Sequence, residues 1–101
     1  MTAFDEWASN SQAYYEELRN TLIKKQRDYG PHAISNAPGG ALNGIRVRMH
    51  DKMSRANNLI DNSVVSPENE PLIDAFADLA NYAIIAMMVL RKEWASDFQE
   101  D

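Results

Sequence analysis

The sequence contains no cysteine and only four glycines and four prolines among its 101 residues. Without cysteine, the protein has no disulfide bonds, no cysteine nucleophile and no thiolate metal ligands, which fits a reducing compartment. Because glycine and proline interrupt helices, their scarcity leaves room for long helices. A chain of this length supports one hydrophobic core, so we expect a single domain over residues 1–101.

The sequence also lacks a basic N-terminus, a membrane-length apolar run and an excess of positive charge. Residues 1–20 have neither the basic start nor the apolar core of a secretory signal, and the most apolar run, residues 79–90, is shorter than a bilayer span. The net charge of −5 is negative, whereas proteins that bind a nucleic-acid polymer usually carry an excess of positive charge. We therefore expect a cytoplasmic protein that binds neither membranes nor nucleic-acid polymers.

Apolar residues recur at helical spacing in three segments, which predicts an all-α fold with a small bundle of three main helices. The expected helices cover residues 5–27, residues 42–60, and a third segment from about Pro67 to Trp94. Ser66 is the predicted N-cap of the third helix, with Pro67 at its first position.

The segments outside these helices are expected to be irregular. Residues 30–40 hold two prolines and three glycines, which predicts a loop without regular helix. A loop this long in a small domain is often functional. Residues 95–101 are acidic and are predicted to form a frayed tail.

The third predicted helix is apolar on nearly all sides from Leu79 to Leu90. Such a helix must be buried on more than one side, and two other helices can hardly cover it. We therefore expect a homodimer or a larger homo-oligomer.

Charged residues gather on one face of the second and one face of the third predicted helix. In "RVRMHDKMSR", Arg48, Lys52 and Arg55 lie at i, i+4 and i+7 and share a face. In "IDAFADLANY", Asp74 and Asp78 lie at i, i+4. Paired carboxylates suit Mg²⁺ or Mn²⁺ and basic residues suit phosphate, which is the layout of a metal–nucleotide pocket. In the simpler alternative, the carboxylates only pair with the basic helix and join the two helices.

Three stretches, "KQRDYGPHAI", "GIRVRMHDKMSRANNLI" and "DAFADLANYAIIAMM", carry a resemblance to a known family over roughly residues 25–88. In residue order and spacing, the chain resembles the nucleotide-modification-associated domain family of phages, which is similar to the MazG-like all-α NTP pyrophosphatases. The resemblance implies a Mg²⁺-dependent (or Mn²⁺-dependent) enzyme, dimeric or larger, in the cytoplasm of a phage host.

The resemblance also implies roles for individual residues. The expected catalytic residues are Asp78, Asp74 and Lys52, and the expected metal ligands are Asp74, Asp78 and Asp51. The residues expected to bind nucleotide or phosphate are Arg48, Lys52, Arg55, Tyr29, Gly30, His32, Asn81 and Tyr82.

The sequence departs from the family's acidic motifs at several positions. Where the family has EExxE, this chain has Asp51-Lys52-xx-Arg55, so two of the three acids are replaced by cations. Ala75 stands where the Glu of the second motif, ExxD, is expected. The changes leave fewer metal ligands and favour direct phosphate contact, unless Glu16 or Glu17 supplies the missing carboxylate.

Three functions remain open from the sequence. The preferred one is a Mg²⁺-dependent pyrophosphohydrolase that cleaves nucleoside triphosphate to monophosphate and pyrophosphate. The first alternative is a non-catalytic protein that binds and sequesters a nucleotide. The second alternative is a structural helical oligomer whose charges only join its helices.

Overall fold

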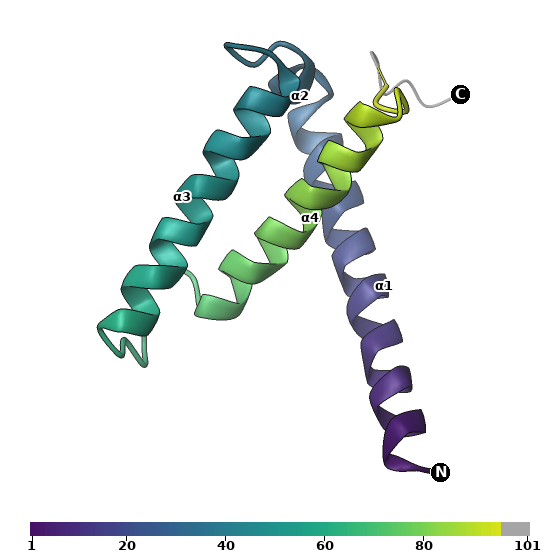
Figure 1. Ribbon diagram of the computed structural model, residues 1–101, viewed down its shortest axis with the longest axis vertical. Helices are drawn as coiled ribbons and strands as arrows, with labels where there is room; N and C mark the ends of the chain where they lie inside the picture. The colour runs from purple at the N-terminus through teal and green to yellow at the C-terminus, as the bar shows by residue number, and fades with distance from the viewer. Residues whose placement is uncertain (96–101) are drawn as a thin grey trace.

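The computed structural model describes residues 1–95, and over this range the protein is all-helical, as predicted, with four helices and no strand (Figure 1). The helices are α1 (Ala3–Tyr29), α2 (His32–Ser35), α3 (Ala41–Asp61) and α4 (Leu72–Leu90). Of the predicted acidic tail, Ala95 follows the last helix as irregular chain, and residues 96–101 lie outside the described range.

Helix α1 begins earlier than the periodicity predicts because Thr2 and Asp5 form a capping box. The Thr2 hydroxyl accepts a hydrogen bond from the Asp5 backbone N–H at 3.1 Å, and the Asp5 carboxylate accepts one from the Thr2 N–H at 3.2 Å. The helix ends at Gly30, whose φ of 70° lies in the left-handed region that glycine adopts without strain.

The predicted start of the third long helix is wrong: α4 starts at Leu72, and residues 66–71 are not helical. A helix starting at Pro67 would place Pro71 in its interior. There the proline ring would clash with the carbonyl four residues earlier and the helix would lose a hydrogen bond. Pro71 instead serves as the N-cap in an extended conformation, and its carbonyl accepts a hydrogen bond from the Asp74 N–H.

The predicted end of the same helix is also wrong, because α4 stops at Leu90. Lys92 has a φ of 58°, and the Glu93 N–H donates back to the Met88 carbonyl at 2.8 Å. This left-handed turn ends the helix. Trp94 then folds back, and its indole N–H donates to the Pro31 carbonyl at 3.2 Å.

The segment predicted as a plain loop contains the short helix α2, so the exclusion of helix from residues 30–40 is wrong. Ile34 explains the ordering, since it is 2% exposed and packs in the core with Ile45 and Ile85. The following turn approaches α3 so closely that a Cβ on Gly44 would lie 2.4 Å from the Cβ of Ala37. Only glycine at position 44 permits this packing.

Helix α3 packs along α4, and the C-terminal half of α1 crosses α4, while the N-terminal half of α1 extends away from the other helices (Figure 1). Helix α1 contributes no fully buried residue. Its extended half carries four exposed aromatic side chains, namely Phe4, Trp7, Tyr14 and Tyr15.

The chain exposes more surface than a compact monomer of its size. Its accessible surface is 7715 Å², whereas size scaling gives roughly 5,800 Å² for a folded monomer of this mass. Its radius of gyration is 15.9 Å, against about 13 Å for a compact domain of this length. Helix α4 is long and apolar enough to cross a membrane by length and composition alone, with 17% of that stretch buried in the protein. The oligomer expected from the sequence stays a prediction.

Candidate functional site

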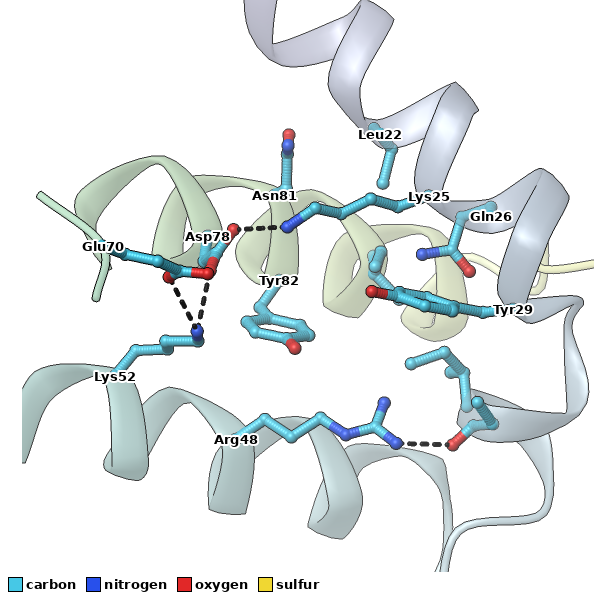
Figure 2. A pocket seen from close by; sticks show the side chains of 13 residues that line it. Leu22, Lys25, Gln26, Tyr29, Arg48, Lys52, Glu70, Asp78, Asn81 and Tyr82 are labelled. Atoms are coloured by element: carbon cyan, nitrogen blue, oxygen red, sulfur yellow. Dashed lines mark hydrogen bonds and ion pairs between the residues drawn. The ribbon is translucent and has the colours of Figure 1, made fainter. Parts of the chain in front are cut away.

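A pocket of about 460 Å³ lies where α1, α3 and α4 converge, with residues of α2 at its edge (Figure 2). Three of its lining residues are cationic, namely Lys25, Arg48 and Lys52, and two are acidic, namely Glu70 and Asp78. The pocket is therefore locally basic in a protein whose net charge is −5.

Each of the three long helices places two polar or aromatic side chains one turn apart on the face that lines the pocket. Residues at i and i+4 share a helix face, so one orientation of the helix presents both. The pairs are Lys25 with Tyr29 on α1, Arg48 with Lys52 on α3, and Asp78 with Tyr82 on α4.

Asp78 is the centre of the charged part of the pocket. Its side chain is 13% exposed, and its two oxygens bind two different lysines. Oδ1 accepts from the Lys25 ammonium at 2.9 Å, and Oδ2 lies 2.9 Å from the Lys52 ammonium. Glu70 is a weaker partner, with its Oε2 4.0 Å from Lys52 Nζ (Figure 2).

These contacts shift the pKa of all three central groups. Burial alone would raise the pKa of Asp78, but the hydrogen bonds from Lys52 and Lys25 outweigh it and hold that pKa below its ordinary value. The hydrogen bond to Asp78 raises the pKa of Lys25 and of Lys52 above the usual lysine value. Both ammonium groups and the carboxylate are therefore charged at neutral pH.

Aromatic and amide side chains form the rest of the polar wall. Figure 2 shows the rings of Tyr29 and Tyr82 bordering the pocket between Lys25 and Arg48. Arg48 also donates to the Ala33 carbonyl at 3.2 Å, which fixes its guanidinium beside α2.

Two buried amide oxygens in this wall have no hydrogen-bond partner among the described residues. Asn81 is 7% exposed and ties α4 to α1 by donating from Nδ2 to the Leu18 carbonyl at 3.1 Å, but its Oδ1 is unpartnered. Gln26 Oε1 is also buried without a hydrogen-bond partner among the described residues. Buried acceptors in native proteins normally have a donor, and a buried water molecule is one group that can supply it.

Six of the residues predicted for the site line this pocket, namely Tyr29, Arg48, Lys52, Asp78, Asn81 and Tyr82. The structure places five predicted residues outside its lining, namely Gly30, His32, Asp51, Arg55 and Asp74. Gly30 turns the chain after α1, His32 is exposed at the start of α2, Asp51 is exposed on α3, and Asp74 is half-buried in the first turn of α4.

Arg55 has a structural contact, and its predicted phosphate contact stays a prediction. Its guanidinium donates to the Glu70 carbonyl, which holds the segment before α4 against α3. Glu16 and Glu17, the alternative source of a carboxylate, are exposed on α1 and border a different surface hollow.

Lys25, Gln26 and Glu70 line the pocket although the sequence did not single them out as site residues. A signal for Lys25 was present, because it lies one helical turn before Tyr29 and shares its face. Glu70 lies in irregular chain before α4, where helical periodicity does not predict the direction of a side chain.

The acidic residues as placed do not fit a Mg²⁺ ion held by protein side chains alone. Over residues 1–95, no group of three or more His, Asp or Glu side chains is close enough to hold a metal. The Lys52 ammonium lies between Asp78 and Glu70, and Lys25 takes the other Asp78 oxygen. The requirement for Mg²⁺ or Mn²⁺ stays a prediction from the resemblance.

The charged triad formed by Lys25, Asp78 and Lys52 predicts a pH dependence of stability. Because the pKa of Asp78 is lower in the folded chain than its ordinary value of 3.8, its stabilisation is present above that value and is lost as the pH falls through the folded pKa. Because the lysine pKa values are raised above 10.5, their stabilisation is present below that value and is lost as the pH rises through the folded pKa.

The check is urea unfolding of the wild type and of Asp78→Asn from pH 2.5 to 11. We expect the difference between the two unfolding free energies to be largest on the plateau between these limits and to shrink below pH 3.8 and above pH 10.5. A difference that stays constant across the whole range would contradict the charge assignment.

Comparison with protein-family models, with curated proteins and with solved structures finds no match to this chain. The resemblance to the nucleotide-modification-associated domain family therefore stays a prediction that rests on sequence motifs, and the pocket has to be interpreted from its own chemistry.

Proposed function

We propose that this pocket binds the phosphate groups of a nucleotide. The observation that carries the proposal is the convergence of three cations from two helices, Lys25, Arg48 and Lys52, on one pocket, where the two lysines share the partly buried carboxylate of Asp78. Asp78 and Glu70 offset two of the three positive charges, so the lining keeps one net positive charge, which favours an anionic ligand.

Asp78 has a clear role in such a binding site. It holds the two ammonium groups at 2.9 Å, so both are in the pocket before the ligand arrives. Each ammonium has three N–H donors and gives one to Asp78, which leaves others for phosphate oxygens. Binding then requires little rearrangement, and preorganisation of this kind raises affinity.

The remaining wall suits a nucleoside. The pocket volume of about 460 Å³ is in the range of small-molecule sites. The rings of Tyr29 and Tyr82 provide faces on which a base can stack. The side-chain amides of Asn81 and Gln26 belong to the same polar wall.

The second candidate is the Mg²⁺-dependent pyrophosphohydrolase, in a MazG-like bundle of three main helices completed by further chains. The observation that favours it is the position of two carboxylates, Asp78 and Glu70, which both contact the Lys52 ammonium in the pocket (Figure 2). Mg²⁺ commonly binds through one or two carboxylates together with substrate phosphates, so a nucleotide could bring the ion with it.

One experiment separates the two candidates. Each NTP and dNTP is titrated into the protein by calorimetry in EDTA, and a parallel set is incubated with Mg²⁺ or Mn²⁺ and resolved by ion-exchange chromatography. Metal-independent binding with intact nucleotide supports the binding protein. Monophosphate and pyrophosphate, formed by the wild type and not by Asp78→Ala, support the hydrolase. Neither binding nor turnover would overturn both candidates.

A further inference from the structure

The outward face of α4 carries a continuous apolar stripe that no other part of residues 1–95 covers. The stripe consists of Ile73, Phe76, Ala80, Ala83, Met87 and Leu90. It contains every exposed residue of α4, with the half-buried Ala80 completing it, and Ile73 and Leu90 at its ends are 60% and 66% exposed. The spacing alternates between three and four residues, which is the heptad pattern of a helix that packs against another helix.

We propose that a second copy of this chain covers the stripe, with the two α4 helices antiparallel about a two-fold axis. The order of residues is symmetric about the point between Asn81 and Tyr82. An antiparallel pair centred there places Ile73 opposite Leu90 of the second copy, Phe76 opposite Met87, and Ala80 opposite Ala83. A two-fold interface requires self-complementarity of this kind.

The side-chain sizes along the stripe fit this arrangement. The two alanines lie at the centre, where the helices cross and their backbones come closest. The large side chains lie at both ends, where the helices diverge and more space has to be filled. Helices in contact are separated by about 8–10 Å, and small residues at the crossing point favour the lower end of that range.

The charges at the ends of α4 also favour the antiparallel orientation. Glu68 and Asp74 lie at its N-terminal end, whereas the exposed Arg91 and Lys92 follow its C-terminal end and outnumber Glu93. An antiparallel pair brings the acidic end of each helix to the basic end of the other and opposes the two helix dipoles. A parallel pair would bring like charges together.

The surface that the monomer leaves exposed is large enough for a permanent dimer. The accessible surface of the chain is 7715 Å². This exceeds the surface expected for a compact monomer of the same mass by an area on the order of 1,000–2,000 Å². Permanent homodimers bury about this area on each partner. This excess includes the extended N-terminal half of α1 (Figure 1) as well as the stripe, and a second copy of the chain is large enough to cover both, unlike a small or transient partner.

The absence of native cysteine allows a clean cross-linking test. We expect the wild type to have twice the chain mass of 11.4 kDa by light scattering. The double variant Ile73→Cys/Leu90→Cys should form a disulfide-linked dimer on oxidation with copper–phenanthroline. Each single variant should stay uncrosslinked, because two copies of one end position lie roughly 25 Å apart in the antiparallel pair.

A charge at the centre of the stripe gives an independent readout with a matched control. Ala83→Glu should halve the mass to that of one chain, whereas Ser54→Glu, an exposed site on α3, should leave the dimer intact. Efficient cross-linking of either single cysteine variant would overturn the antiparallel arrangement. A wild-type monomer that co-sediments with phosphatidylcholine vesicles would overturn the second copy as the occupant and assign the stripe to a lipid bilayer.

Discussion

Replacing Asp78 with asparagine is expected to destabilise the protein by about 2 kcal/mol and to lower its Tm by about 10 °C. The amide keeps the shape of the side chain but removes the negative charge that lies 2.9 Å from two ammonium groups. Lys25 and Lys52 then repel each other with no carboxylate between them. Their side chains are 44% and 28% exposed, so water screens part of the repulsion and keeps the effect below that of a fully buried pair.

The same substitution is expected to strengthen phosphate binding, because the removal of a negative charge from the pocket outweighs the loss of the carboxylate that preorganises Lys25 and Lys52. The wild-type pocket has three cationic and two acidic side chains, and Asp78→Asn leaves three cationic side chains and one acidic side chain. We expect about a fivefold higher affinity for inorganic phosphate at low salt, and phosphate should restore more stability to the variant than to the wild type. Calorimetry and thermal melts with and without phosphate measure both effects.

The matched control is Asp74→Asn, one turn earlier on α4 and outside the pocket lining. It removes a carboxylate from the first helical turn and should lower the free energy of unfolding by less than about 1 kcal/mol. It should not raise the affinity for phosphate. If Asp78→Asn bound phosphate more weakly than the wild type, the preorganisation of Lys25 and Lys52 by Asp78 would outweigh the repulsion between its carboxylate and phosphate.

The long helices could be predicted from the sequence, whereas their ends and the short helix could not. Apolar periodicity located α1, α3 and α4 because it follows from which face of a helix is buried. The end of α4 depends on the left-handed turn at Lys92, which no periodicity encodes. Helix α2 forms because Ile34 enters a core that three distant segments build, and that contact is invisible in a local window.

The candidate site could be predicted only in part, for a related reason. Spacing shows which residues share a face of one helix but not which neighbour that face meets. Lys52 and Asp78 were both singled out, and they lie 2.9 Å apart in the structure. Arg55 shares the face of Lys52 by spacing, yet its guanidinium donates to the Glu70 carbonyl and Arg55 does not line the pocket.

Lys25→Met is expected to lower the affinity of the pocket for inorganic phosphate about tenfold. The methionine keeps most of the side-chain length and apolar volume but removes the ammonium that lies 2.9 Å from Asp78 Oδ1. A charge-assisted hydrogen bond to phosphate is worth about 1.5–3 kcal/mol. The exposure of Lys25 places its effect at the lower end of that range, because water competes for the same donor.

The chain supplies a matched control in the neighbouring residue, because Lys24 is exposed on α1 and does not line the pocket. Lys24→Met removes the same charge from the same helix, so it lowers the net charge of the protein equally. If binding depended only on long-range attraction, both variants would lose affinity to the same extent, and the loss would vanish at about 0.5 M salt. If Lys25 donates directly to phosphate, only Lys25→Met loses affinity about tenfold, and most of that loss persists at high salt. Equal affinities for the two variants in calorimetric titrations at both salt concentrations would therefore remove Lys25 from the binding site, and with it the phosphate pocket as we define it.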